Sequence, residues 1–530
     1  MYYRYFIFVF LSFLFGCARQ HYFQNDALYS PAPSSEIKPA APESYLVTAG
    51  RHYQKNKIHQ LFWGKHYREV WATPVLAPAI DLNNVKGGLS PFELGGGLQS
   101  TSLALKNKQG RIFTMRTLDK DPAKSIMPFF RKTFLANIMR DQTAAINPYA
   151  AFMVPPLAEA VQVHHTNPEL FYVPQNQAGL GEYSKFFNGK VVMLEEKFTA
   201  KASLSAAFGK ATDLVNTKTF LQNNFASSNH RPDQLAFARA RLFDVLILDW
   251  DRHVGQWNWA VIPAENRQEF IYEPVPKDRD QAFYRYDGFI PWLTTRKFLT
   301  KPFKILRHNR QDVAGLIYKA CFLDERLLNE VTRTEWLDIS QNMQVNLTSE
   351  VLRKSVAALP ELVQKKVGEN TFKLLQTRRD KLPALAEKFY KLLAKKVTIA
   401  GTDEKELFRV TRIGEKTLVQ VFTISDDQAE EPALYYKREF LAKETKEIIL
   451  RGLGQDDEFL VTGQATSSPL LVIYGDKGND KITDTSKVKG ICKKTIVYDT
   501  RSQTTLQLGQ ESKYKTSDQV QVKEYERTTE

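Results

Sequence analysis

The densest run of polar side chains capable of chemistry lies near the middle of the chain, at Leu248–Trp257. It contains Asp251, His253 and Gln256 among further charged neighbours. Directly before it comes Ala236–Ile247, whose apolar residues indicate a helix or another buried run. The sequence therefore predicts a catalytic-looking polar loop at the end of a buried element.

A β-hairpin is predicted immediately after this loop. Trp257–Ile262 and Glu269–Val275 are strand-like, and Pro263–Asn266 between them has the composition of a turn. The hairpin ends in a second acidic cluster, which contains Asp278 and Asp280. Since the end of a hairpin returns to the neighbourhood of its start, the loop and the acidic cluster should lie side by side.

Four side chains with oxygen atoms are predicted to converge here: Asp251, Gln256, Asp278 and Asp280. Carboxylate and amide oxygens are ligands suited to Mg²⁺ or Mn²⁺. A second interpretation is that the aspartates of both segments form structural ion pairs with Arg252 and Arg279, as alternating charges at a surface often do. The aromatic neighbours Trp250, Trp257 and Trp259 are expected in the core.

A glycine-rich turn lies far upstream, between two predicted strands. Gly95, Gly96 and Gly97 lead into the first strand, Lys106–Gln109 makes a turn, and Arg111–Leu118 is the return strand. Glycines let the backbone approach an anion closely, although such triplets also occur as plain flexible turns.

The return strand delivers two cations to the same region. Arg116 lies near its end and Lys120 just beyond it, and either could reach phosphates held under the glycine turn. The order of glycine turn, cation, polar loop, hairpin and acidic cluster is the order of parts in protein-kinase-like folds.

The polar loop resembles the catalytic loop of atypical kinases. Asp251-Arg252-His253 followed by Gln256 looks like the Asp-Arg-His-x-x-Asn loop of HipA-type and CotH-type kinases, and it resembles the loop of secretory-pathway kinases. The resemblance implies a two-lobed α+β fold and phosphoryl transfer from ATP or another nucleotide.

The acidic cluster carries a second part of this resemblance. Asp278-x-Asp280-x-x-Phe283 is similar to the metal-binding motif of CotH-type kinases, at the place where protein kinases have Asp-Phe-Gly. The whole run from Gly95 through Arg116 to Phe283 looks like a module of Bacteroidetes-type surface and periplasmic proteins. That module also occurs joined to calcineurin-like phosphoesterase domains.

The resemblance implies a role for each matching residue of the loop and the cluster. Asp251 would be the base that orients a substrate hydroxyl, with His253 beside it as a second catalytic candidate. Gln256 and Asp278 or Asp280 would be the metal ligands.

It also implies how the nucleotide phosphates would be held. Arg116 or Lys120 would clamp them beside the glycine turn. Glu159, on the helix-like run Pro156–Val161, would pair with that cation as the glutamate of the αC helix does in kinases.

Two positions depart from the kinase pattern. Gln256 replaces the usual Asn, which adds a methylene where metal geometry is strict, and Arg116 replaces Lys. Both substitutions fit an active atypical kinase, and both also fit a pseudokinase.

The amino terminus has the composition of an export signal. Met1–Arg4 is basic, Tyr5–Phe15 is nearly all apolar, and Cys17 follows a small residue. This pattern resembles a bacterial lipoprotein signal peptide, which implies that Cys17 becomes the acylated (palmitoylated) first residue of the mature chain. The alternative is an ordinary signal peptide with an incidental cysteine. Residues 18–43, rich in Pro, Ser and Ala, are expected to form a flexible tether.

This anchor would hold the protein at the cell envelope, outside the cytoplasm. The outer membrane or the cell surface is favoured over the inner membrane. Such a location offers no obvious ATP supply, so phosphoryl transfer would need another donor or an imported nucleotide, and this weighs against an enzyme.

Length and composition exclude several classes of protein. A chain of 530 residues is too long for one core, and 43% hydrophobic with 25% charged residues is typical of folded globular proteins. Three cysteines exclude a disulfide framework. The net charge of +14 favours anionic partners, but the basic residues are dispersed, so we expect no nucleic-acid binding.

The body should fold as three consecutive blocks. Residues 44–303 form the kinase-like core with its lead-in, residues 304–397 a helical extension, and residues 398–530 a β-rich domain. In the last block, residues 475–484 resemble a calcium-binding β-roll turn, and Gly452–Asp457 is a looser echo of it. Because true β-roll repeats are nonapeptides, a simple turn is favoured over calcium.

Two functions from different classes remain open. One is a membrane-tethered, metal-dependent kinase-like phosphotransferase that acts on an unknown protein or glycan. The other is a non-catalytic envelope protein that uses the kinase-like core as a scaffold for binding.

Overall fold

The structure is a computed structural model of the chain. It describes residues 18–19, 21–29, 44–96, 100–175, 177, 179–199, 201–264, 269–294, 313–425, 431–499, 504–515 and 525–527. The predicted acylation site Cys17, the last glycine of the triplet, Gly97, and most of the predicted tether lie outside these residues. Within the described ranges, no helix combines the length and the apolar character needed to cross a membrane.

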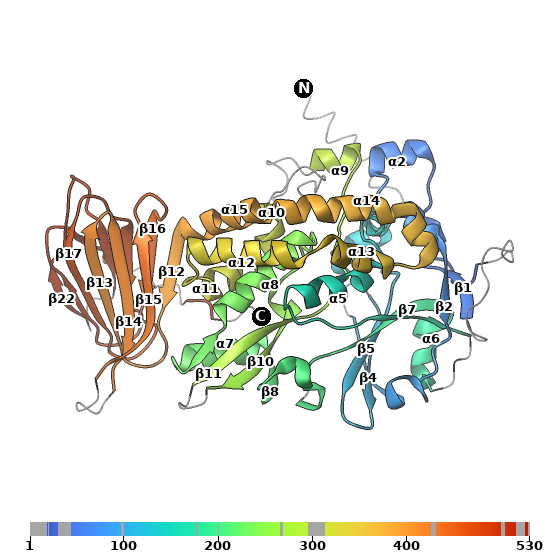
Figure 1. Ribbon diagram of the computed structural model, residues 1–530, viewed down its shortest axis with the longest axis horizontal. Helices are drawn as coiled ribbons and strands as arrows, with labels where there is room; N and C mark the ends of the chain where they lie inside the picture. Colours follow the sequence, from blue (N-terminus) through green and yellow to red (C-terminus); the bar gives the residue numbers. More distant parts are fainter. Residues whose placement is uncertain are drawn as a thin grey trace.

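The described chain consists of a larger α+β body and a β domain that stands beside it (Figure 1). The α+β class and the β-rich carboxy-terminal domain predicted from the sequence are confirmed. In the body, two sheets with separate strand orders give two lobes, and long helices run across both toward the β domain.

The first lobe is built on a five-stranded antiparallel sheet with the order β3-β4-β5-β7-β6. Its strands are β3 (Leu89–Gly95), β4 (Ser102–Asn107), β5 (Ile112–Thr117), β6 (Glu169–Val173) and β7 (Lys190–Glu196). The predicted hairpin after the glycine turn is therefore confirmed as β4 and β5. Helix α5 (Ala150–Ala160) connects the central strand to the last pair.

Alternation along β5 gives the sheet two different faces. Phe113 and Met115 point into one apolar cluster, which covers one face of the sheet. Thr114 and Arg116 must therefore point to the opposite face. On that face Val191 and Met193 of β7 belong to the main core of the body, so Arg116 is held at the edge of a packed interior.

An amino-terminal layer packs against this lobe. It contains β1 (Ser44–Thr48), β2 (Pro74–Pro78), α2 (Lys57–Trp63), α3 (Arg68–Ala72), α4 (Phe134–Gln142) and α6 (Ser184–Phe187).

The predicted tether is corrected for residues 21–29, which are packed on the body. Tyr22 and Ala27 are buried, and the Ala27 amide donates to the Gly189 carbonyl at 2.9 Å. The tether was predicted from prolines, and all of these lie after residue 30, whereas this segment carries an aromatic pair that can be buried.

The second lobe contains the polar loop and the hairpin. Its sheet has the order β8-β10-β11-β9, with strands β8 (Asp213–Asn216), β9 (His230–Pro232), β10 (Trp257–Pro263) and β11 (Phe270–Pro276). β10 and β11 pair antiparallel from Trp257 opposite Pro276, which confirms the predicted hairpin. Trp257 and Trp259 are fully buried, as expected for core residues.

Helices surround this sheet and form the rest of the body. They are α7 (Thr217–Ala226), α8 (Gln234–Leu246), α9 (Phe289–Thr294), α10 (Val313–Leu316), α11 (Cys321–Leu327), α12 (Arg333–Asn346), α13 (Ser349–Ala357), α14 (Glu361–Asp380) and α15 (Leu382–Ala394). Their starts are fixed by capping: the Asp233 carboxylate accepts from the Ala236 amide at α8, and Thr332 and Glu335 form a capping box at α12.

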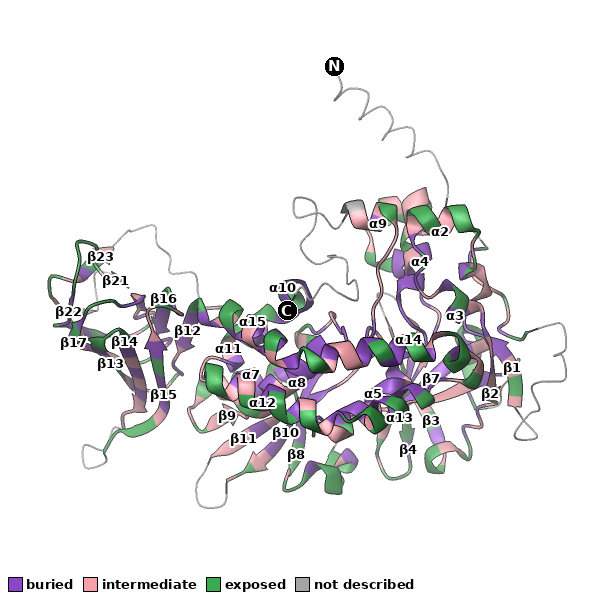
Figure 2. Ribbon diagram, turned by 45° about the horizontal axis from the view of Figure 1, so that its top comes forward, coloured by how far each residue is buried: buried purple, intermediate pink, exposed green. Residues whose placement is uncertain are grey.

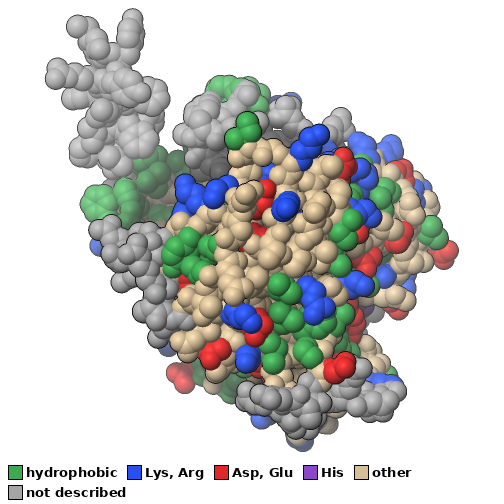
Figure 3. All heavy atoms as spheres, turned by 90° about the vertical axis from the view of Figure 1, so that its left-hand side faces the viewer, with side chains coloured by type: hydrophobic (Ala, Val, Ile, Leu, Met, Phe, Trp, Pro, Cys, Tyr) green, Lys and Arg blue, Asp and Glu red, His purple; other side chains and the backbone are tan. Residues whose placement is uncertain are grey.

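The β domain is a solenoid of two parallel sheets. The chain passes back and forth between them: one sheet contains β12 (Lys396–Ala400), β16 (Glu447–Arg451), β18 (Leu470–Tyr474), β21 (Thr495–Tyr498) and β23 (Ser512–Lys515). The other contains β13 (Glu406–Gly414), β17 (Glu458–Ala465), β19 (Lys481–Asp484), β20 (Lys487–Val488) and β22 (Thr505–Leu508). The antiparallel strands β14 (Lys416–Thr423) and β15 (Ala433–Leu441) extend the second sheet. On the face shown in Figure 3, basic and acidic side chains are interspersed with hydrophobic ones.

The two calcium-like turns occupy the same place on successive coils of this solenoid. The Asp457 amide donates to Asp480 Oδ1 at 2.9 Å across a separation of 23 residues, which is one coil. One coil earlier, the Glu406 amide donates to Asp457 Oδ1 at 2.9 Å. The acids of the two turns therefore stack on one another, with Glu406 one coil before them. We call Glu406, Asp457 and Asp480 the carboxylate column.

Burial dominates the electrostatics of the carboxylate column. It raises the pKa of Asp457 to about 9, with further contributions from the charges of Glu406 and Asp480, whose own pKa values are each raised to about 7. Oδ2 of Asp457 and Oδ2 of Asp480 are buried and have no hydrogen-bond partner. The folded domain therefore retains protons that the unfolded chain would release near pH 4.

We predict that the free energy of unfolding of the β domain falls as pH rises from about 4 to about 9, because the folded state binds more protons than the unfolded state over this range. Asp457→Asn keeps the acceptor for the Glu406 amide and removes the titrating group. It should stabilise the domain at pH 8 by at least about 1 kcal/mol and flatten the pH dependence, as measured by chemical denaturation. Asp456→Asn, at the exposed neighbouring position, is the matched control. Stability that rises with pH would contradict this prediction.

Candidate functional site

Arg116 and Lys120 meet the acidic cluster across the boundary between the two lobes. Arg116 forms an ion pair with Asp278, and a second one, at 3.8 Å, with Asp280. Lys120 forms an ion pair with Asp280. On its own sheet, Arg116 also pairs with Glu195, at 3.2 Å between Nη2 and Oε1. We call these five side chains the cross-lobe cluster.

The cross-lobe cluster combines buried cations with an excess of acids. Burial lowers the pKa of Lys120 to about 8, although Asp278 acts in the opposite direction. Burial alone would raise the pKa of Asp278, but Arg116 and Lys120 hold it below its ordinary value. Burial raises the pKa of Glu195. With three carboxylates against two cations, the cluster is suited to bind additional positive charge when all of them are ionised.

The polar loop contributes Asp251 and Gln256 to the edge of this cluster. Gln256 Nε2 donates to Asp278 Oδ2 at 3.4 Å, so the predicted proximity of these two residues is observed. Asp251 is held by Lys319, whose Nζ donates to Oδ1 at 2.6 Å. The charge of Asp251 also acts on Lys120, so it lies within electrostatic reach of the cluster.

His253 caps a short turn of the loop. Its Nδ1 accepts from the Gly255 amide at 3.1 Å, and the residue is exposed. The His253 ring therefore lies at the surface of the loop, two residues from Asp251.

A buried arginine joins the polar loop to the acidic cluster. Arg252 Nη2 donates to the Gln256 carbonyl at 2.9 Å, and Nη1 donates to the Lys277 carbonyl at 2.8 Å. The Asp249 carboxylate lies 3.6 Å from the same guanidinium. The Trp257 ring centroid is 4.7 Å away. Because Arg252 is fully buried, it links the two segments from inside.

The sequence also allowed the aspartates of the two segments to form structural ion pairs with Arg252 and Arg279. This holds for one aspartate and is wrong for three. Asp249 pairs with Arg279 at 3.0 Å as well as with Arg252, in the interior behind the site. Asp251, Asp278 and Asp280 instead pair with Lys319, Arg116 and Lys120. The reason is that Arg252 and Arg279 are directed inward, away from the lobe boundary.

Left-handed backbone marks both ends of the site. Leu248 has φ of 59° at the start of the loop, and Asp278 and Phe283 have φ of 58° and 56° in the acidic motif. Such φ values are uncommon for residues other than glycine, and for bulky side chains they must be imposed by the surroundings. Here the Phe283 amide donates to the carbonyl of Ile247, the residue before Leu248, at 2.6 Å, which ties the end of the acidic motif to the start of the loop.

The glycine turn lies in the same row of the sheet as Arg116. Gly95 pairs opposite Ser102, and Ser102 pairs opposite Arg116. Gly96 has φ of 87°, and a Cβ atom there would stand 1.9 Å from the Ser100 carbonyl oxygen. Glycine is therefore required at this position for the turn itself.

The predicted pairing of Glu159 with a cation is corrected. Glu159 is exposed on α5, and among the described residues the ion-pair partners of Arg116 are Glu195, Asp278 and Asp280. Sequence reasoning missed Glu195. Its signal was available, because alternation puts Glu195 on the same face of β7 as the buried Val191 and Met193.

The donor set at the lobe boundary fits a hard divalent cation in part. Across the described ranges, no group of three or more His, Cys, Asp or Glu side chains is arranged to hold a metal ion. Asp278, Asp280 and the Gln256 amide supply two carboxylates and one amide oxygen. Mg²⁺ is commonly bound by one or two carboxylates, with phosphate oxygens and water as the remaining ligands, so the fit requires a phosphate ligand as well.

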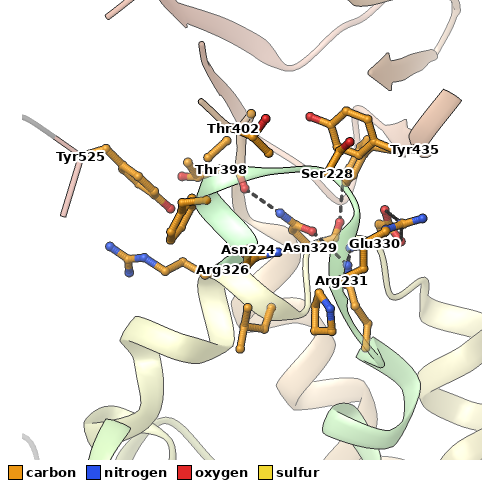
Figure 4. Close-up of a pocket in the computed structure, with 17 residues that line it drawn as sticks. Asn224, Ser228, Arg231, Arg326, Asn329, Glu330, Thr398, Thr402, Tyr435 and Tyr525 are labelled. Atoms are coloured by element: carbon orange, nitrogen blue, oxygen red, sulfur yellow. Dashed lines mark hydrogen bonds and ion pairs between the residues drawn. The ribbon is translucent and has the colours of Figure 1, made fainter. Parts of the chain in front are cut away.

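A cavity of about 70 Å³ lies away from the cross-lobe cluster, in the seam between the body and the β domain, and Figure 4 shows its polar lining. Arg231 and Glu330 form an ion pair at 2.9 Å there, and the Asn329 amide donates to the Thr398 carbonyl at 3.1 Å. Tyr525 enters the seam from the carboxy-terminal segment. This cavity has room for a few water molecules, and the contacts around it join the body to the β domain.

Comparison with known proteins gives likeness at the level of structure alone. No protein-family model matches the chain, and no curated protein matches it. Among solved structures, the chain is similar to the Helicobacter pylori proinflammatory kinase CtkA, at 12% identity over 59% of this chain and 99% of that chain, with a TM-score of 0.29. It is also similar to the amicoumacin kinase hAmiN, at 10% identity over 56% of this chain and 88% of that chain, with a TM-score of 0.16. Both neighbours are kinases, and the assignment below depends on the side chains of this chain.

We predict that Arg252→Lys destabilises the body by about 3 kcal/mol or more, since a lysine cannot donate to both carbonyls and also face Asp249. Arg333→Lys, which alters an exposed pair with Glu387, should cost less than about 1 kcal/mol. Thermal and denaturant unfolding of both variants would measure the difference. Equal stability of the two variants would show that Arg252 does not hold the loops together.

Proposed function

We propose that this chain is a kinase-like protein of the cell envelope that binds a nucleotide in the presence of Mg²⁺ or Mn²⁺ and transfers its phosphoryl group to a protein or glycan acceptor. The acceptor and the donor nucleotide stay undefined. The proposal goes beyond the kinase-like likeness in structure, and its support is the arrangement at the lobe boundary.

The observation that carries the proposal is the cross-lobe cluster. Arg116 comes from the sheet that bears the glycine turn, whereas Asp278 and Asp280 follow the hairpin of the other lobe. Their ion pairs bring together residues about 160 positions apart. A purely structural core would not need five charged side chains at a lobe boundary beside a polar loop.

In this proposal each residue has one task. Arg116 and Lys120 bind phosphate oxygens, and Arg116 lies in the same row of the sheet as Gly95, two strands away. Asp251 orients the acceptor hydroxyl and accepts its proton. Asp278, Asp280 and Gln256 hold the divalent cation, which when bound neutralises phosphate charge.

The cross-lobe cluster must exchange its internal ion pairs before it can bind a nucleotide and a cation. Asp278 and Asp280 are already paired with Arg116 and Lys120. A nucleotide with its cation would offer each side chain a partner of opposite sign, so the internal pairs would be exchanged for pairs with the ligand. Net burial of charge would change little in that exchange.

The same pairing favours a second candidate, a non-catalytic binding protein. The carboxylates of Asp278 and Asp280 already have cationic partners, and Asp251 forms an ion pair with Lys319. If these pairs persist in solution, the body is a scaffold, and the β domain would contact a partner or a glycan.

Two further parts of the proposal concern the envelope. We propose that Cys17 is acylated and anchors the protein to the outer membrane or the cell surface. We also propose that the turn at residues 475–484 binds calcium, with the buried Oδ2 atoms of Asp480 and of Asp457, one coil earlier, as oxygen ligands.

We predict that the purified protein binds ATP or another nucleoside triphosphate only with Mg²⁺ or Mn²⁺, as measured by calorimetry. Asp280→Asn should weaken this binding at least tenfold, because a carboxylate ligand of the cation is lost. Asp251→Asn should bind normally and lose phosphoryl transfer to a mixed acceptor preparation. Asp403→Asn, in an exposed pair with Arg527, is the control.

Each outcome separates the two candidates. Binding with turnover that Asp251→Asn abolishes supports the phosphotransferase. Binding without turnover supports the scaffold. Absence of metal-dependent binding to the native protein and to all variants would remove the nucleotide proposal.

We predict that the full chain, expressed in a bacterium that processes lipoproteins, incorporates labelled palmitate and sediments with membranes. Cys17→Ser should lose both properties, because the acyl acceptor is gone. Cys321→Ser, at an exposed free cysteine, should retain both. Retention of the label by Cys17→Ser would overturn the anchor.

A further inference from the structure

An apolar surface lies on the helices at the end of the body where the described chain begins. On α2, Ile58, Leu61 and Phe62 are 71%, 69% and 45% exposed, and no residue of this helix is buried. Phe289 of α9, 53% exposed, contacts Phe62 edge to face at 6.3 Å between ring centroids. We call these four side chains the apical patch, and Figure 2 shows α2 and α9 next to each other at one end of the body.

The orientation of α2 is fixed by its other face. His59 and Trp63 line a cavity of about 510 Å³ together with residues of α4. His59 Nε2 lies 3.1 Å from Asp141 Oδ2. Since residues three and four positions apart share one face of a helix, Ile58, Leu61 and Phe62 must point together away from α4. Their exposure is therefore a property of the docked helix.

Cations accompany the apolar side chains. The segment from residue 51 to residue 66 contains four Lys or Arg side chains and no Asp or Glu, as does the segment from 122 to 140. The second segment also carries Met127 and Phe129, which are 66% and 77% exposed. Large exposed apolar side chains accompanied by lysines and arginines are typical of protein surfaces that lie in the headgroup region of a bilayer.

The start of the described chain is attached to this same end. The Ala18 amide donates to the Lys132 carbonyl at 2.8 Å, and the Arg19 amide donates to Asn137 Oδ1 at 2.9 Å. Cys17 is thus one residue from a backbone bonded to the basic segment. Acyl chains on Cys17 would therefore be attached close to Lys132, and no long tether would separate the body from the lipid.

We propose that the apical patch is a membrane-docking surface, which rests in the headgroup region of the bilayer that holds the anchor. This inference rests on the proposed acylation of Cys17 and adds an orientation to it: the body lies against the membrane by α2 and α9. The β domain stands at the left of the body in Figure 1, apart from α2 and α9 at its top.

A depth-sensitive fluorescence experiment tests the docking. The full lipidated chain carries Cys321→Ser and Cys492→Ser, so that a single introduced cysteine takes an environment-sensitive nitrobenzoxadiazole label. Leu61→Cys places the label in the apical patch. Ile491→Cys places it at an exposed apolar residue of the β domain and is the matched control. The protein is reconstituted in vesicles of phosphatidylethanolamine and phosphatidylglycerol, with and without doxyl-labelled lipid.

The expected result is a blue-shifted label at position 61 that loses at least half of its emission to doxyl lipid, with no change at position 491. Replacing Ile58, Phe62 and Phe289 by Ser should at least halve the quenching at position 61. Replacing Ile413 and Leu434 of the β domain by Ser should not.

Failure of the docking surface can be told apart from failure of the anchor. If the protein floats with the vesicles but the label at position 61 stays in water, the anchor stands and the docking surface is overturned. If the label at position 61 is shielded equally without vesicles and forms cross-links between chains, a second copy covers the patch, and the proposal is overturned. If the chain does not float and the label is not quenched, both proposals fail.

Discussion

The arrangement of the site depends on one buried guanidinium. Arg252 donates to the carbonyls of Gln256 and Lys277, and so bonds the end of the polar loop to the start of the acidic motif from within the protein. Asp244 and Asp249 balance its charge, and Arg279 pairs with the same two carboxylates. With both segments fixed from behind, their remaining acids are left to face the first lobe.

The lobe boundary is consequently a balance of opposite charges. Arg116 and Lys120 form ion pairs with Asp278 and Asp280, which avoids the cost of isolated buried charges. The same groups are those that a nucleotide and a divalent cation would engage. In the function we propose, the ease with which these internal pairs are exchanged would decide between phosphoryl transfer and binding alone.

Local signals in the sequence predicted the local structure well. Turn residues and alternation identified the β4–β5 and β10–β11 hairpins, and the hairpin geometry placed Gln256 beside Asp278. Glu195 was missed because its contact with Arg116 depends on the pairing of strands about 80 positions apart. The solenoid was missed for a similar reason: its 23-residue coil is longer than the nonapeptide repeat, and only parallel pairing brings Asp457 next to Asp480.

The solenoid begins at the body, and its last described coil is the outermost one. β12 follows α15 directly and lies beside the seam, whereas β23 is the outermost strand of its sheet. In such a stack each coil is stabilised only by its neighbours. Unfolding should therefore begin by fraying at β22 and β23 and proceed inward, so that the coils nearest the body keep their amide protons longest in hydrogen exchange and the domain can lose its tip without detaching.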